Sequence, residues 1–163
     1  MLLFSILVAS VGCGKPSGQG VSAADIPNGQ DSSCTPTDQD QYVWRPGRLK
    51  LLQPCRQVTG TVTVVSAEEP DGDIHIELRP DASYQALLTA GNLNGNLVLE
   101  AVCQYVPPMI EALRLCASDP DPYLGPFPQI GDHIWVEGRY VLDLWHGSQA
   151  ELHPIYRWGK INP

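Results

Sequence analysis

Several features that identify enzymes and nucleic-acid-binding proteins are missing from this sequence. Basic residues are scarce, since 10 Lys and Arg stand against 18 Asp and Glu and give a formal net charge of −8. That charge repels phosphate backbones, so nonspecific nucleic-acid binding is unfavourable. The sequence also has no Walker-type glycine loop, no dinucleotide-binding fingerprint, no HExxH motif and no nucleophile-elbow serine. The familiar nucleotide-binding and hydrolytic motifs are therefore excluded.

Long apolar runs are missing too, and the N-terminal run is short. Residues 1–13 combine an apolar stretch with small residues and end at Cys13. A bilayer-spanning helix needs about 20 apolar residues, so this segment is instead typical of a signal peptide. Its end, Val11-Gly12-Cys13, resembles a bacterial lipoprotein signal, in which the cysteine after the cleavage site takes a lipid. We predict an extracytoplasmic protein, either secreted or anchored to the membrane through Cys13.

The next segment, residues 14–41, is rich in Gly, Ser, Asp, Pro and Gln and has almost no large apolar side chains. Such a composition buries too little surface to offset its ordering entropy, which predicts a flexible polar tether. Residues 42–163 then form one domain, a size that a single core can support.

Cysteine usage indicates the same compartment. Beyond Cys13 four cysteines remain, an even number that predicts disulfides in an exported chain, and none shows the C-x-x-C spacing of zinc or redox sites. Three pairings are possible for four cysteines. We favour Cys34 with Cys55, which clips the tether to the first strand, and Cys103 with Cys116, which closes a short excursion.

Alternating apolar positions predict five strands, and a turn-prone cluster joins the first two as a hairpin. A short helical spacing lies at 84–90, and a helix bounded by prolines is predicted at 109–116. The predicted strands are 58–65, 73–78, 97–103, a fourth that opens at Gly131-Asp132 and extends through Leu142, and 151–161.

Three motifs occur within this order of elements: Val58-Thr59-Gly60-Thr61-Val62, Gly131-Asp132-His133-Ile134-Trp135-Val136-Glu137-Gly138 and Glu151-Leu152-His153-Pro154-Ile155. They are similar to the first, fourth and fifth strands of the OB-fold, a five-stranded Greek-key barrel. In the first strand, a glycine permits the sharp coil that closes such a barrel. The resemblance implies a mainly β fold, a small OB-like barrel with one or two short helices.

Two further motifs carry a second resemblance. Asp71-Gly72-Asp73-Ile74-His75 occurs together with His146-Gly147 followed by Glu151-Leu152-His153-Pro154. The combination resembles a group of exported prokaryotic proteins without an established role. That group has Trp after the His-Gly pair, where this chain has Ser148. The resemblance implies the fold and the compartment, and it supplies no chemistry.

The same motifs contain the densest group of candidate metal ligands, which are Asp73, His75, His146, Glu151 and His153, with Asp71 beside them. Alternation places Asp73 and His75 on one outward strand face and Glu151 and His153 on another. Because the first and last strands of an OB barrel lie near one another, we expect these edges to converge at a site suited to zinc or another divalent ion.

Two simpler interpretations compete with this metal site. In the first, a tight turn explains the composition of Asp71-Gly72-Asp73, and His75 and His153 form hydrogen bonds on the surface. The acidic run Glu68, Glu69, Asp71 and Asp73 offers oxygen ligands to calcium, but it lacks the spaced twelve-residue loop, so a solvated turn is favoured.

Aromatic residues suggest a different binding surface, because OB barrels bind oligonucleotides or oligosaccharides on faces where rings stack. The acidic charge opposes nucleic acid, which leaves a saccharide, a peptide or another protein as partner. The alternative is that each ring packs in the barrel or its rim. The candidates are Trp135, Tyr140, Trp145, Tyr156 and Trp158, flanked by Arg139 and Arg157.

Two functions follow from the sequence. The first is a noncatalytic binding or assembly module outside the membrane, which uses an OB-type barrel face and for which no cofactor is expected. The second is a metal-dependent hydrolase or nuclease-like enzyme with ligands from His75, His146, His153, Asp73 and Glu151.

Overall fold

The structure is a computed structural model, and it describes residues 34–67, 69–118 and 125–161. The predicted signal peptide, the lipid site at Cys13, tether residues 14–33 and Glu68 lie outside the described residues. Among the described residues, none of the helices has the length and apolar character needed to cross a membrane.

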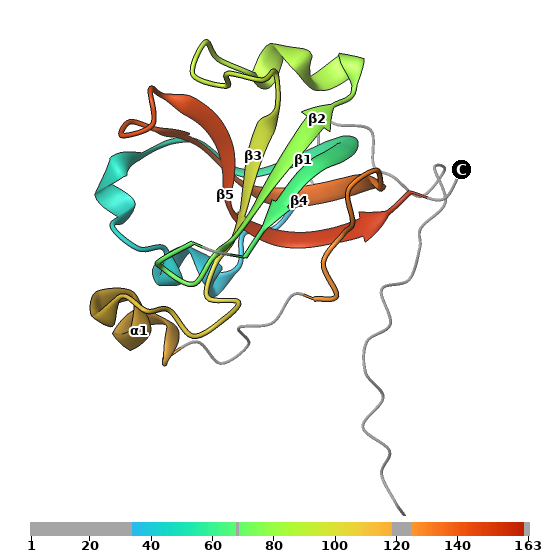
Figure 1. Cartoon of the computed structure of the whole chain (residues 1–163). Coiled ribbons are helices and arrows are strands. Elements are labelled where there is room, and N and C mark those ends of the chain that lie inside the picture. Colours follow the sequence, from blue (N-terminus) through green and yellow to red (C-terminus); the bar gives the residue numbers. More distant parts are fainter. Residues whose placement is uncertain (1–33, 68, 119–124, 162–163) are drawn as a thin grey trace, which may run out of the picture.

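The described chain is mainly β, as predicted, with five strands and short helical segments (Figure 1). The strands are β1 (Leu49–Ser66), β2 (Ile74–Pro80), β3 (Leu97–Ala101), β4 (His133–Asp143) and β5 (Gln149–Lys160). The helical segments are the α-helix α1 (Ile110–Cys116) and the 3-10 helices η2 (Asp38–Tyr42), η3 (Pro46–Arg48) and η4 (Ala82–Leu87).

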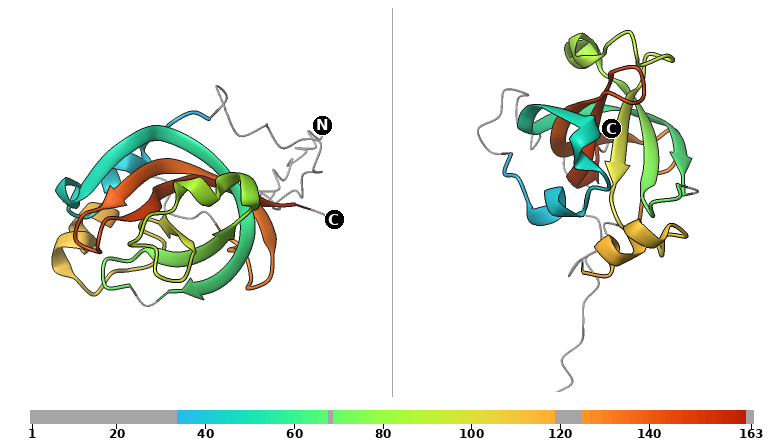
Figure 2. Two further views of the ribbon diagram at one scale, coloured as in Figure 1. Left: turned by 90° about the horizontal axis from the view of Figure 1, so that it is seen from above. Right: turned by 90° about the vertical axis from the view of Figure 1, so that its left-hand side faces the viewer.

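The five strands form one sheet that closes on itself in the order β1-β2-β3-β5-β4, with β4 pairing back to β1. Seen from above, the strands curve around a common centre (Figure 2). The β3–β5 pair is parallel, whereas the other four pairs are antiparallel. The first and last strands, β1 and β5, do not pair with each other. Strand β3 lies between β2 and β5 and pairs with both.

Two apolar clusters hold the fold together. Alternation along the strands places the larger cluster inside the closed sheet, with Leu78, Leu99 and Leu152 at 0% exposure. The smaller cluster lies on the outer face, where Val141 of β4 packs with Tyr42 and Val43 of the N-terminal segment. The N-terminal segment therefore covers part of the outer face of the sheet.

An irregularity in β5 changes which side chains point inward. Leu152 and Ile155 are three residues apart, yet both belong to the inner cluster, because the β4–β5 register shifts between Gly138 and Tyr140. Simple alternation pairs Leu152 with Tyr156 as inward residues, and that prediction is wrong for Tyr156. Its hydroxyl instead donates to the Asp40 carboxylate at 2.6 Å, under the N-terminal segment.

Both predicted disulfides are confirmed. Cys34 is bonded to Cys55 with their Cα atoms 5.6 Å apart, and Cys103 to Cys116 with their Cα atoms 5.1 Å apart. Residues 34–41, which the composition assigns to the tether, pack on the sheet through a buried Gln39 and through Asp40. The ordered structure therefore begins before residue 42.

Replacing Gly60 with Ala is expected to destabilise the protein. An added Cβ would meet the backbone carbonyl of Arg79 and would lie 2.8 Å from the Pro80 Cα. Backbone shifts of this kind cost about 1–3 kcal/mol. Gly47→Ala is the control, because nothing lies within 4 Å of its added Cβ. Thermal unfolding should show a clear loss for Gly60→Ala and little change for Gly47→Ala, and equal melting temperatures would contradict this account.

Candidate functional site

A pocket of about 400 Å³ lies on the outer face of the sheet. Its chemistry is acidic, since the described residues that line it include six carboxylates and a single arginine, Arg48. The carboxylates are Glu69, Asp71, Asp73, Glu100, Asp143 and Glu151, and the histidines are His75, His146 and His153. All five residues predicted as metal ligands therefore line one pocket.

The residues converge by a route that differs from the predicted one. His75 on β2 stands opposite Glu100 on β3, and the parallel partner of Val98 on β3 is Glu151 on β5. Strand β3 thus brings the two predicted edges together. The alternative of surface hydrogen bonding is wrong for His153, which is 1% exposed, and the solvated turn is wrong for Asp73, which is 4% exposed.

Each pocket histidine has its Nδ1 atom beside a carboxylate oxygen. In a neutral ring that carries its proton on Nδ1 to make that bond, the Nε2 atom presents a lone pair. Metal-binding histidines in proteins are commonly oriented in this way. The three pairs are His75 with Glu100 at 2.8 Å, His146 with Asp143 at 2.9 Å and His153 with Glu151 at 3.1 Å.

The Asp143 carboxylate holds several groups together at one end of the pocket. Its carboxylate is fully buried and forms an ion pair with Arg48. It also accepts hydrogen bonds from the backbone N–H groups of Trp145 at 2.8 Å and His146 at 3.3 Å. These bonds fix the turn between β4 and β5, which carries Trp145 and His146 to the pocket.

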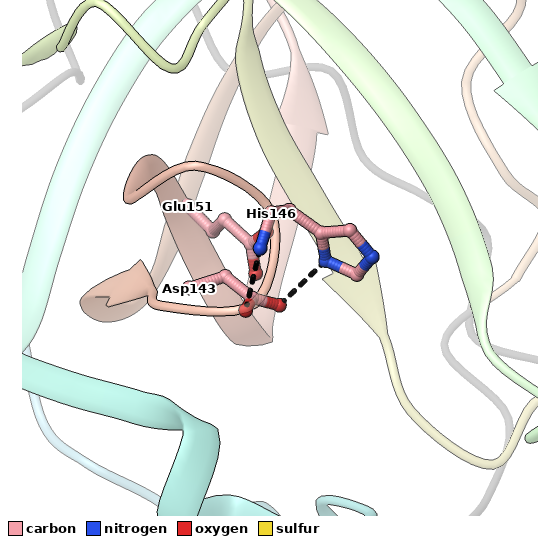
Figure 3. Close-up of side chains that lie close together, drawn as sticks. All are labelled: Asp143, His146 and Glu151. Atoms are coloured by element: carbon pink, nitrogen blue, oxygen red, sulfur yellow. Dashed lines mark hydrogen bonds and ion pairs between the residues drawn. The ribbon is translucent and has the colours of Figure 1, made fainter.

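Ligand atoms of Asp143, His146 and Glu151 lie within 4.8 Å of one another, a spacing that suits a metal ion (Figure 3). The existing contacts argue against metal binding there. Both Asp143 oxygens already have partners, and the Arg48 charge would repel a cation. Glu151 is engaged as well, by Gln149 at 2.6 Å and by His153. We therefore treat this trio as a structural clasp.

Burial and mutual repulsion set the protonation of the pocket. Burial raises the pKa of Asp73 well above its usual range, and the charges of Asp71 and Glu100 add to the effect. Burial likewise raises the pKa of Glu100. The hydrogen bond to Glu100 raises the pKa of His75 to about 9, so this ring is a cation at neutral pH. Although burial opposes it, the bond from His153 lowers the pKa of Glu151.

Two tryptophans lie at the mouth of the pocket. Trp44 comes from the segment between η2 and η3, and Trp145, which is 59% exposed, comes from the β4–β5 turn. The Arg45 guanidinium lies 4.4 Å from the Trp44 ring centroid and 5.6 Å from that of Trp145. Arg45 thus makes a cation–π contact with both rings at the rim.

The other residues of the predicted aromatic face are dispersed. Tyr140 belongs to the inner core, and its hydroxyl donates to the Leu87 carbonyl at 2.6 Å. Tyr156 is buried under the N-terminal segment, where Arg139 pairs with Asp40 at 3.7 Å. The remaining members also pack or pair locally: Trp135 against Gly159, Trp158 against the core and Arg157 with Glu137. Of this set, Trp145 alone lines the pocket.

Sequence reasoning missed three important residues of the pocket. Glu100 is a lone carboxylate in the apolar strand Leu97–Ala101, and this contrast was an available signal. Asp143 stands three residues before His146, a spacing typical of a side chain that accepts from the following turn. Arg48 has no comparable signal, because its role arises from a tertiary ion pair.

Comparison with protein-family models finds no match, and comparison with curated proteins finds no match either. The function is therefore inferred from the chemistry of the pocket.

Replacing Arg48 with Met should strongly destabilise the protein, because it leaves the Asp143 charge buried without its partner. Breaking such a pair costs about 3–5 kcal/mol. Lys160→Met provides the control, since it breaks the more exposed pair of Lys160 with Asp132, and such pairs are worth about 1 kcal/mol or less. Urea unfolding measures both, and similar losses in the two variants would argue against the clasp.

Proposed function

We propose that this chain is an extracytoplasmic, noncatalytic binding domain of the OB type, and that its ligand is a small cation held in the acidic pocket. The observation that carries the proposal is the charge imbalance of that pocket, where six of the described carboxylates face one arginine and the cationic ring of His75. Buried carboxylates need a compensating positive charge or a proton. A cationic ligand supplies that charge.

The strand order supports the OB assignment. The sheet closes as β1-β2-β3-β5-β4, and α1 lies in the chain between β3 and β4. Glycines stand at the predicted positions in β1 and β4, and a Cβ on Gly60 or Gly138 would collide with a neighbouring strand. These features support the proposed five-stranded Greek-key barrel.

The disulfides support the extracytoplasmic assignment, because such bonds persist in oxidising compartments and are rare in the cytosol. The signal-like segment 1–13 points the same way. We propose that the domain is either secreted or held at a membrane surface by a lipid on Cys13.

Cation binding is tested by thermal shift of chelator-treated protein with Zn²⁺, Mn²⁺, Ca²⁺ and spermidine, and with oligo-dT as an anionic probe. At least one cation should raise the melting temperature saturably, whereas oligo-dT should not, because the pocket repels phosphates. Asp73→Asn keeps an acceptor for the Cys103 N–H but removes a charge, and it should weaken cation binding about tenfold or more.

Glu111→Gln is the matched control, since Glu111 lies exposed on α1 and does not line the pocket. This variant should bind the cations as the parent protein does. Failure of every cation to stabilise the protein, or stabilisation by oligo-dT, would refute the proposal.

A metal-dependent hydrolase is the second candidate, and the Asp143–His146 pair favours it. The His146 side chain is 63% exposed, and Asp143 holds its Nδ1 atom, which leaves Nε2 free to take a proton from a water. A metal held in the pocket would supply the acidity that such a water needs. Metal-loaded protein would then hydrolyse p-nitrophenyl esters or phosphodiesters, and His146→Gln would lower the rate about 100-fold or more. Absence of turnover with bound metal would leave the binding domain as the function.

A further inference from the structure

The innermost wall of the pocket contains a buried histidine nitrogen that has no hydrogen-bond partner. His153 is 1% exposed, and its Nδ1 atom lies 3.1 Å from the Glu151 carboxylate. Its Nε2 atom is buried and makes no hydrogen bond. Buried polar atoms are almost always satisfied in native proteins. An unsatisfied nitrogen in the wall of an acidic pocket therefore points to a ligand.

The Asp73 carboxylate faces this nitrogen, and it too is fixed through one of its polar atoms while the other points toward the proposed site. Asp73 is 4% exposed, and its Oδ1 atom accepts a hydrogen bond from the Cys103 N–H at 3.0 Å. Its Oδ2 atom lies 3.8 Å from the His153 Nε2 atom. That separation is too long for a hydrogen bond. A tetrahedral zinc ion, with bonds of about 2.0–2.2 Å, holds its ligand atoms about 3.4 Å apart.

We infer that the pocket binds one divalent transition-metal ion of the zinc class between the Nε2 atom of His153 and the Oδ2 atom of Asp73. This inference rests on the proposed function and names the cation. An imidazole nitrogen beside a carboxylate suits zinc-class ions, whereas calcium and magnesium prefer sites made of oxygen alone. A closing movement of a few tenths of an ångström brings the two ligand atoms to bonding distance of a single ion.

Glu100 is a further carboxylate in the lining of the same pocket. Its Oε1 atom is bonded to His75 Nδ1 at 2.8 Å, and its Oε2 atom is buried without a hydrogen-bond partner. Each of the two proposed ligands is oriented through its other polar atom, His153 by Glu151 and Asp73 by the Cys103 N–H. Such supporting contacts are typical of metal sites.

The experiment uses the full chain, produced with its disulfides formed, treated with chelator and then titrated with Zn²⁺ by calorimetry. One equivalent should bind. His153→Gln should weaken Zn²⁺ binding about 100-fold or more, and Glu151→Gln should weaken it about 10–100-fold, because it removes the residue that orients the His153 ring. His133→Gln is the matched control, since His133 lies outside the pocket beside Asp81.

X-ray absorption of the Zn²⁺-loaded parent protein tests the ligand set without any substitution, should His153→Gln fail to fold. The spectrum should show Zn²⁺ coordinated by one imidazole nitrogen together with oxygen ligands. Two or more imidazoles would overturn the assignment, as would full Zn²⁺ affinity in a folded His153→Gln protein. If Zn²⁺ does not bind but spermidine still stabilises the protein, this inference fails and the proposed function stands. If no cation binds, both fail.

Discussion

The parallel pairing of β3 with β5 is the contact on which the rest of the structure depends. It consists of two register pairs, Val98 with Glu151 and Leu99 with Leu152, and it completes the closed sheet. Leu99 and Leu152 seal the core, while the outward neighbours of these residues form the pocket. Without this pairing, the acid–histidine pair on β2 and β3 and the pair on β5 would lie at separate edges.

The buried ion pairs of the pocket contribute little to the stability of a small domain. Buried ion pairs such as Arg48 with Asp143 are often no better than apolar side chains of the same size, because desolvation offsets the attraction. The same holds for His153 and Glu151, both almost fully buried. A chain that selection favoured for stability alone would place apolar residues at these positions. Their presence agrees with the binding role proposed above.

Much of the fold was predictable because a half-buried strand shows in the sequence. Residues 58–65 alternate, and they form the half of β1 that packs on the core. The first half of β1, from Leu49 onward, was missed because several of its side chains are exposed and it is held by pairing with β4. Alternation also failed at Tyr156, where the register shift rotates the strand. Bulges and edge pairing depend on the partner strand, so a local pattern cannot contain them.

For the candidate site too, the local sequence pattern predicts one part and tertiary packing determines the rest. The spacing of Asp73 and His75 placed both on one outward strand face, and the structure sets their side chains in the pocket. What the spacing could not give is depth, which comes from the N-terminal segment packed over Val141 and fastened by the bond from Cys34 to Cys55. Burial leaves the His153 Nε2 atom without a hydrogen-bond partner among the described residues. The sequence motifs therefore identify which side chains line the pocket, whereas their burial depends on how the folded chain covers the sheet.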